Sequence, residues 1–303
     1  MSGDSTARSQ SAGKKKQTGS MSSGWNAAVY RSRIADADKL QRFEGCSPNV
    51  EEIGQYRDYA LSAVSGGRSP RALVLGMTPE LRCMAAAAGF ELISVDRNPD
   101  AIAVFRDWLQ EPARSREVII QDEWAALGEH LSGGVDVILG DGIFSNVLDL
   151  DSHYTLLKDF GKLLKPGGAI ILRQVSIPRN FPMQQYDAGM LLEKYRAGQL
   201  SDAEFGAAMR LWGMSRLAYD PDTCLLDNRV VFEYLDAMAE SGIVTAAELA
   251  VVRRCYFSGK NMILPQDAWE QILTESGLEF QVRPLTGKDW YSYYQLYYCR
   301  LSA

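Results

Sequence analysis

Short apolar runs alternate with amphipathic segments through the middle of the chain. The apolar runs lack the polar alternation of a half-exposed strand, and they fall at residues 71–75, 91–95, 118–121, 135–140 and 169–172. Helical patterns separate several of them, at residues 79–88, 99–109 and 154–164. Continuous apolar strands are typical of a sheet that is buried on both faces. The pattern therefore predicts an α/β fold with a doubly wound, mostly parallel sheet.

The residues at the starts of these helical segments support their boundaries. Pro79 and Pro99 stand at first helical positions, where the missing N–H of proline costs nothing. Thr78 is the expected N-cap of the first of these helices. For the helix predicted from residue 154, either Asp151 or Ser152 is expected to be the N-cap.

The predicted core covers residues 67–176, and helical patterns also precede and follow it. Residues 25–66 predict N-terminal helices, with patterns over 25–37 and 50–64. Their first residues are expected either to fold over a bound ligand as a lid or to pack in the core; the candidates are Trp25, Tyr30 and Arg31. Residues 263–303 predict a last helix and a strand pair that complete the core sheet.

Residues 177–262 contain helix-like runs and no clear strand. The runs cover residues 186–199, 203–217, 228–239 and 245–256. This predicts a helical cap over the carboxyl ends of the sheet, the alternative being an ordinary helical subdomain or a dimer surface. Its polar and aromatic candidates for lining a site are Arg173, Arg179, Tyr186, Trp212, Tyr219 and Arg229. The three arginines make a carboxylate or phosphate on the substrate conceivable.

Composition narrows the function classes. The chain has 303 residues, a formal net charge of -6 and a pI near 5.2, which argue against a protein that coats nucleic acid or an anionic membrane. The apolar runs all fall short of the ~18 residues that span a bilayer. Residues 1–24 are polar, without the apolar segment of a secretory signal, and predict a disordered tail. An acidic cap with exposed aromatics permits a homodimer.

Cysteines and histidines argue against disulfides and bound metal. The five cysteines are scattered and form no C-x-x-C pair, and the only histidines are His130 and His153. An odd number of dispersed cysteines is typical of a reducing compartment, so a cytoplasmic location is expected. Two isolated histidines do not predict a zinc site.

The turn after the first strand indicates the ligand. Gly76 follows the strand, and Asp96 ends the next strand 20 residues later, the spacing at which a βαβ unit offers a carboxylate to a ribose. A pyrophosphate-binding turn needs further glycines, but these positions hold Thr78, Pro79 and Glu80. Glu80 would repel a diphosphate and suits a positively charged ligand. S-adenosylmethionine, which carries an ammonium and a sulfonium and no phosphate, fits this turn better than NAD.

Five elements in order resemble the class I S-adenosylmethionine-dependent methyltransferases, over roughly residues 71–175. They are the turn at residues 75–80, the carboxylate Asp96, the third-strand acid Asp122, the fourth-strand end at 139–142 and the run at 163–168. The turn departs from the fuller glycine pattern of the family and resembles a bacterial subgroup with Leu-Gly-x-Thr-Pro-Glu. The resemblance implies a Rossmann-like sheet with an antiparallel last strand, and caps that enclose small substrates.

The resemblance also implies the roles of individual residues. Gly76 would let the backbone approach the methionine portion, Asp96 would accept from the ribose hydroxyls, and Asp122 would accept from the adenine amino group beside Glu123 or Trp124. Gly140 and Asp141 would line the methyl-transfer side. The full cofactor set is Gly76, Met77, Thr78, Glu80, Asp96, Arg97, Asp122, Glu123, Trp124, Gly140, Asp141 and Gly142. The alternative for Asp96 and Asp122 is helix capping or a loop turn.

Methyl transfer is an in-line displacement in which the protein chiefly positions the nucleophile. A general base is needed only for a protonated nucleophile, and Asp141 and His153 are the candidates. A small-molecule methyl acceptor is expected. The alternatives are a non-catalytic S-adenosylmethionine-binding protein, a protein or nucleic-acid methylase, and a nicotinamide-dependent oxidoreductase. The strand end Gly140-Asp141-Gly142 lacks the Asn/Asp-Pro-Pro-aromatic loop of base methylases, and the lone Gly76 disfavours NAD.

Overall fold

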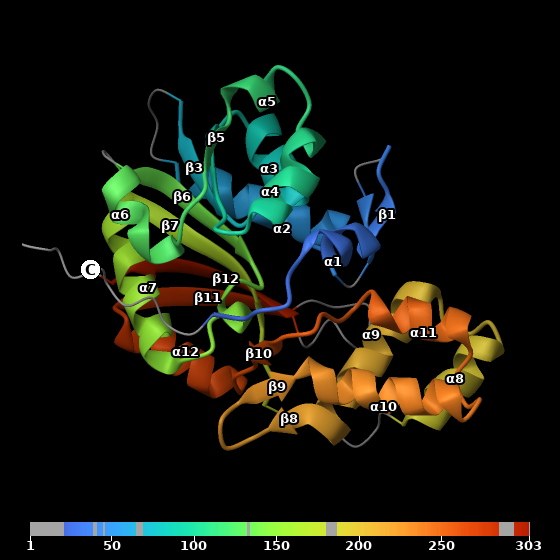
Figure 1. The fold of residues 1–303 in the computed structure, drawn as a ribbon. Helices are drawn as coiled ribbons and strands as arrows, with labels where there is room; N and C mark the ends of the chain where they lie inside the picture. The colour runs from blue at the N-terminus through green and yellow to red at the C-terminus, as the bar shows by residue number, and fades with distance from the viewer. Residues whose placement is uncertain are drawn as a thin grey trace, which may run out of the picture.

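The computed structural model describes residues 21–38, 41–44, 46–64, 69–131, 134–179, 187–284 and 294–302. A seven-stranded sheet of order β11-β12-β7-β6-β3-β4-β5 runs through these residues (Figure 1). The strands are β3 (Arg71–Leu75), β4 (Glu91–Val95), β5 (Val118–Ile120), β6 (Val135–Asp141), β7 (Leu164–Val175), β11 (Leu278–Pro284) and β12 (Tyr294–Leu301). Pairing is parallel except where β12 meets β7 and β11. The predicted sheet, with its antiparallel last strand, is confirmed.

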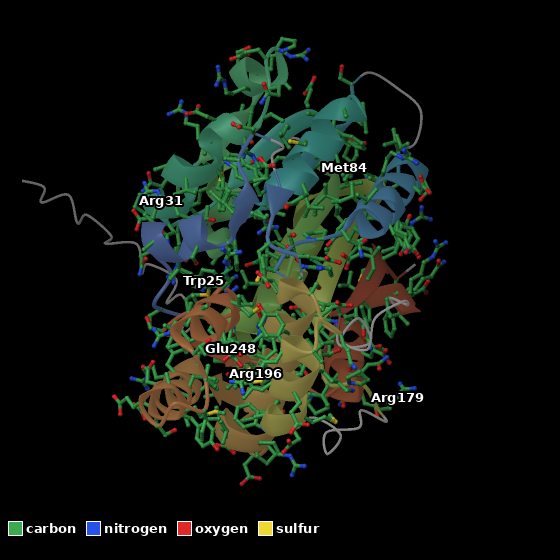
Figure 2. The ribbon with its side chains drawn as sticks, turned by 90° about the vertical axis from the view of Figure 1, so that its right-hand side faces the viewer. Trp25, Arg31, Met84, Arg179, Arg196 and Glu248 are labelled. Carbon is green, nitrogen blue, oxygen red and sulfur yellow. The ribbon has the colours of Figure 1, made fainter. Side chains whose placement is uncertain are left out.

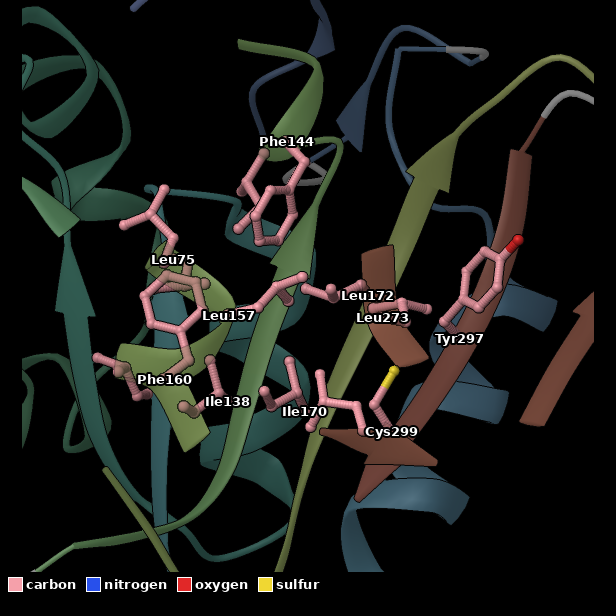
Figure 3. Close-up of a cluster of buried hydrophobic side chains, with 14 of the residues drawn as sticks. Leu75, Ile138, Phe144, Leu157, Phe160, Ile170, Leu172, Leu273, Tyr297 and Cys299 are labelled. Carbon is pink, nitrogen blue, oxygen red and sulfur yellow. The ribbon is translucent and has the colours of Figure 1, made fainter. Parts of the chain in front are cut away.

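Alternating side chains of β3 pack into two different cores. Ala72 and Val74 join the cluster with α2 (Val50–Ser62) and α3 (Pro79–Ala87), whereas Leu73 and Leu75 join the cluster with α7 (Leu150–Leu163) and α12 (Gln266–Glu275). Successive side chains of a strand point to opposite faces, so a strand covered on both faces must be apolar throughout. Figure 3 shows the second cluster, in which residues of α7 and α12 pack on β6, β7 and β12.

The helices of the core differ from the predicted ranges at their ends. α7 begins at Leu150, four residues before the predicted start, because Asp149 is its N-cap and accepts from the Ser152 N–H at 2.9 Å. The predicted caps Asp151 and Ser152 therefore lie inside the helix. α4 (Pro99–Phe105) ends earlier than predicted and continues as a 3₁₀ turn. The remaining short helices are α5 (Ala113–Arg116) and α6 (Leu127–His130).

Four helices follow β7, in the region predicted to be a cap. These are α8 (Ala188–Arg196), α9 (Asp202–Gly213), α10 (Asn228–Glu240) and α11 (Ala246–Arg253), which share their own apolar core. In Figure 1 they gather beside the sheet, at the side of the molecule where α1 (Ala27–Ser32) also lies. Three short strands pair within this region, β8 (Tyr219–Asp220), β9 (Leu225–Asp227) and β10 (Lys260–Met262). The expectation of no strand here was wrong, because strands of two or three residues carry no readable alternation.

The N-terminal segment is ordered from residue 21. Met21 bridges to Val147, and the Ser22 N–H donates to the Asn146 carbonyl at 2.7 Å. Residues 21–24, which belong to the predicted disordered tail at residues 1–24, are therefore ordered, and residues 1–20 lie outside the described residues. The helix predicted over 25–37 is only α1, followed by the strands β1 (Ile34–Asp36) and β2 (Gln41–Arg42). Among the residues that the structure describes, every helix is too short or too polar to cross a membrane.

Candidate functional site

A cavity of about 310 Å³ lies at the carboxyl ends of the parallel strands. The segments that follow β3, β4, β5 and β6 line it, together with Val175 at the end of β7 and Tyr294 at the start of β12. Residues 21–25 and Phe257, from the connection between α11 and β10, also line it. Ligands of open α/β sheets bind at this edge because the loops there leave a crevice between strands.

The turn after β3 needs glycine. Gly76 has φ +87°, the left-handed region that favours glycine, and its N–H donates to the Val95 carbonyl at 2.7 Å. A Cβ at this position would lie 3.8 Å from Oδ2 of Asp96. Gly76 and Asp96 thus lie close together in the cavity wall, which Met77 and Thr78 continue.

Asp96 is a largely buried carboxylate at the end of β4. Its Oδ1 accepts from the Asn98 N–H at 2.8 Å, and the Met77 N–H also donates to this carboxylate. Burial raises the pKa of Asp96 to about 6, because a charged carboxylate loses hydration there and the two backbone donors recover only part of it. A ligand that donates hydroxyl hydrogens to Asp96 would compensate the charge.

The residues after β5 form a second polar corner of the cavity. The Asp122 Oδ2 lies 2.6 Å from the His130 Nε2, and its Oδ1 accepts from the Glu123 N–H at 2.7 Å. The hydrogen bond with His130 lowers the pKa of Asp122. Arg97 pairs with Glu123 at 3.1 Å, and Trp124 lines the wall beside them. His130 was not among the predicted site residues, and its position at the end of a short helix carries no sequence signal.

A buried network of charges holds Asp141. The Arg173 Nε donates to its Oδ1 at 2.7 Å, and the Arg42 Nη2 lies 3.4 Å from its Oδ2. Arg173 also pairs with Glu52 at 3.1 Å, and Arg42 pairs with Glu80 at 2.7 Å. Because both oxygens of Asp141 face guanidinium groups, its carboxylate positions these arginines and is not directed at a substrate proton. These contacts argue against Asp141 as a general base, although Asp141 lines the cavity.

Of the predicted cofactor and catalytic residues, three fall outside the cavity lining. Glu80 accepts two hydrogen bonds from the Arg42 guanidinium, so Arg42 already neutralises the negative charge that was expected to attract a cationic ligand. Gly140 packs in the sheet, where a Cβ would lie 2.8 Å from Leu172. Of the predicted cofactor residues only these two lie outside, while Gly142 and the other members of the set line the cavity.

His153 is the third, and it is a core residue. Its ring packs edge-on against Phe144 and Trp269, and its Nε2 lies 3.0 Å from the Val147 carbonyl. Burial lowers the pKa of His153. The prediction of a general base here was wrong, because the buried face of α7 turns this side chain into the sheet core.

The N-terminal segment contributes aromatic side chains to the cavity. Trp25 stacks on Phe257 at 4.3 Å between ring centroids and donates from Nε1 to the Asn146 Oδ1 at 3.0 Å. Tyr30 also lines the cavity, whereas Arg31 is exposed at the outer edge of the molecule (Figure 2). Two of the three residues expected to form a lid thus face the site.

Most of the residues that were predicted to line the site from the cap do not line the cavity. Arg179 forms a surface ion pair with Glu270 at 2.8 Å, and Arg229 pairs with Asp227 at 2.6 Å. Trp212 is buried in the cap core. The Tyr219 hydroxyl donates to a backbone carbonyl, and Tyr186 lies outside the described residues. Of the five members of that set that the structure describes, Arg173 alone lines the cavity.

The cavity is also lined by residues that the sequence did not predict. They come from the N-terminal segment, from α9, from the connection before β10 and from β10 itself, and they include Arg33, Arg42, Cys46, Arg210, Phe257 and Asn261. Nothing in their local sequence marks them, because they meet only when the cap folds against the N-terminal segment. Among the described residues there is no group of three or more His, Cys, Asp or Glu side chains that could hold a metal ion.

Solved structures share this fold at low sequence identity. The methyltransferase CcbJ from Streptomyces caelestis matches with a TM-score of 0.54 and 14% identity, covering 92% of this chain and 100% of that chain. A protein from Rhodobacter sphaeroides assigned to the zinc-dependent alcohol dehydrogenases matches with a TM-score of 0.53 and 15% identity, covering 91% and 98%. The glycopeptide N-methyltransferase MtfA, complexed with S-adenosylmethionine, matches with a TM-score of 0.48 and 16% identity, covering 91% and 96%. No family model and no curated protein sequence matches the chain.

Proposed function

We propose that the protein is an S-adenosylmethionine-dependent methyltransferase that acts on a small molecule. The observation that carries the proposal is the meeting of Gly76 and Asp96 at neighbouring strand ends, where both residues line the cavity. Because structural neighbours with nearly equal TM-scores are assigned different chemistries, the residues of the site must decide the function.

The polar groups fit a nucleoside across three strands. β3, β4 and β5 are consecutive in the sheet, so the turn at Gly76, Asp96 and Asp122 follow one another at intervals of about 4.8 Å. Asp96 would accept from the two ribose hydroxyls, and Asp122 would accept from the exocyclic amine of adenine. Hydrogen bonds to a charged acceptor are the strong ones.

The same turn is unsuited to a dinucleotide. A pyrophosphate would need close approach of the backbone at further glycines, where this chain has Thr78 and Pro79. The guanidinium of Arg42, which lines the cavity, is occupied by Glu80 and Asp141. A ligand without phosphates suits this turn.

The residues of the chain would bind and orient, while S-adenosylmethionine when bound supplies the activated methyl group. Asp96 and the Gly76 turn would hold the nucleoside, and Asp141 would hold Arg42 and Arg173 beside the reacting region. The side chains of Trp25 and Phe257 would exclude water from it. A cavity of about 310 Å³ suits a small acceptor better than a nucleic-acid or protein strand.

Calorimetric titration of the full chain with S-adenosylhomocysteine, in parallel with NADH, tests the cofactor. Asp96→Ala should weaken S-adenosylhomocysteine binding by about ten- to a hundredfold, the loss of about 1.5–3 kcal/mol from a charge-assisted contact. Asp58→Ala, at an exposed position of α2, is the matched control and should bind like the wild type. Tight NADH binding, or no binding of S-adenosylhomocysteine, would contradict the proposal.

Turnover distinguishes an enzyme from a binding protein on the same scaffold. Labelled S-adenosylmethionine is incubated with the protein and a panel of small phenols, amines and carboxylic acids, and released S-adenosylhomocysteine is measured. Release with one acceptor class supports transfer. Binding without any release across the panel would favour the non-catalytic alternative.

A further inference from the structure

The cavity extends beyond the strands that a nucleoside would cover. Its polar corner lies after β4 and β5, but its lining continues to Val175 of β7 and Tyr294 of β12. In the sheet order, β12 is four strands from β4, which is about 19 Å at 4.8 Å per strand. The end over β7 and β12 is therefore the part left for the methyl acceptor.

Guanidinium groups converge at this acceptor end. Arg33 from the N-terminal segment, Arg42 from β2 and Arg210 from α9 all line the cavity with Cys46. Arg42 is already neutralised by Glu80 and Asp141. The Arg210 Nη1 donates to the Tyr294 hydroxyl at 3.1 Å, which places its guanidinium at the β12 edge of the cavity.

The Arg33 guanidinium stacks on an aromatic ring, and its buried Nε makes no hydrogen bond. Its guanidinium stacks over the Trp25 ring, 4.5 Å from the centroid, while its Nε is buried and has no hydrogen-bond partner. A buried charged donor that is left unsatisfied costs free energy, which an anionic ligand at this position would recover.

The thiol of Cys46 lies in the positive electrostatic potential of these arginines. The pKa of Cys46 is lowered, first by the hydrogen bond with the Cys255 thiol and then by the charges of Arg33, Arg210 and Arg42. These three cations therefore lie close enough to one buried point to stabilise a negative charge there. Around them the aromatic rings of Trp25, Phe257 and Tyr294 form apolar walls.

We propose that the methyl acceptor carries a carboxylate, which Arg33 and Arg210 bind at the β7 and β12 end of the cavity. The planar guanidinium groups suit a carboxylate, which accepts two parallel N–H donors. The proposal rests on the proposed function, because it takes the bound anion to be part of the methyl acceptor. The anion site itself can be measured without turnover. The sequence suggested three arginines for this role. Arg179 and Arg229 are exposed and paired elsewhere, and Arg173, which lines the cavity, is paired with Asp141 and Glu52.

The test compares acids with their neutral amides. Acetate, benzoate and indole-3-carboxylate, each beside its amide, are titrated by calorimetry into the full chain saturated with S-adenosylhomocysteine. At least one acid should bind about tenfold or more tightly than its amide. Arg33→Met and Arg210→Met should each abolish that preference, because they weaken binding of the acid more than binding of the amide.

Control variants separate charge from folding. Arg31→Met changes an exposed arginine of α1 and should leave the acid preference intact. Arg33→Lys keeps the positive charge and should keep part of the preference. Thermal melts identify any variant that fails to fold, and for such a variant the lysine substitution provides the comparison.

Three outcomes would overturn the proposal. The first is that no acid binds more tightly than its amide, which would mean that the acceptor is not anionic. Inorganic phosphate that binds more tightly than every acid would assign the site to a phosphate. The third is that Arg33→Met weakens S-adenosylhomocysteine but not 5′-methylthioadenosine, which lacks the amino-acid portion; Arg33 would then bind the cofactor carboxylate.

Failure of the proposed function has a different signature. If the wild type does not bind S-adenosylhomocysteine, the titrations are repeated on the ligand-free chain. An acid preference that depends on Arg33 and Arg210 there would support the anion site while the cofactor assignment falls. Normal S-adenosylhomocysteine binding without any acid preference would leave the proposed function standing and remove the carboxylate.

Discussion

At the scale of single residues, Asp96 shows how burial sets the properties of the site. Its raised pKa, about 6 against 3.8 for an exposed aspartate, means that the folded chain holds more protons than the unfolded chain between these values. Through this group, the free energy of unfolding falls as pH rises from about 4 to 6 and is constant above. The carboxylate is thus kept ready for a ligand at some cost in stability.

Binding should have the opposite pH dependence to stability. Ribose hydroxyls donate to the charged carboxylate, so the affinity for S-adenosylhomocysteine should rise through pH 6 and level above about pH 7, falling about tenfold per unit below. Calorimetry between pH 5 and 8 measures this. Asp96→Asn should bind more weakly and lose this dependence, and an unchanged slope in the variant would assign the titration to another group.

At the scale of elements, one buried ion pair fastens α3 beside β5. The Arg82 Nη2 lies 2.5 Å from the Glu117 carboxylate, and both side chains are almost fully buried. Arg82 also donates to the carbonyls of Phe105 and Arg106, and the Ser94 hydroxyl donates to Glu117. Because every partner is satisfied within the protein, removal of one leaves a buried charge without compensation.

Arg82→Met should therefore destabilise the fold by about 3–5 kcal/mol. Urea unfolding measures the free energy. Arg82→Met combined with Glu117→Gln should recover part of the loss, because the uncompensated carboxylate is gone. Arg57→Met, at an exposed ion pair of α2, is the control and should change stability by less than about 1 kcal/mol. Equal effects of Arg82→Met and the control would mean that the pair contributes nothing.

At the scale of the whole molecule, the N-terminal segment joins the sheet to the cap. Ser22 bonds to Asn146 on the core side and, through its hydroxyl, to the Lys260 carbonyl on the cap side. A Cβ on Gly259 would lie 1.9 Å from the Ser23 carbonyl oxygen, so this approach of two backbones depends on glycine. The segment closes the cavity only because all three parts meet.

Gly259→Ala should displace residues 21–24 and open the cavity. The affinity for S-adenosylhomocysteine is expected to fall about tenfold, or roughly 1.4 kcal/mol, mainly through faster release. Stopped-flow release and calorimetry measure both. Gly54→Ala in α2, where a Cβ would meet nothing within 4 Å, should instead stabilise the fold by about 0.4–1 kcal/mol and leave binding unchanged. Identical release from the two variants would exclude a closing role.

The sequence by itself determined the order of strands and helices in the core. Strands buried on both faces must be apolar throughout, so their signal is local and survives without knowledge of their neighbours. The meeting of Gly76 and Asp96 was equally readable, because one helix and one strand separate them and adjacent parallel strands bring their ends together.

Only the tertiary structure decided what surrounds that pair. Arg33, Cys46 and Arg210 belong to different elements, and no periodic pattern connects residues that meet across a cap. His153 looked available in the sequence but is buried, and Glu80 looked free but pairs with Arg42. Local patterns record which face of an element is apolar, whereas the partners of a charged side chain depend on segments far away along the chain.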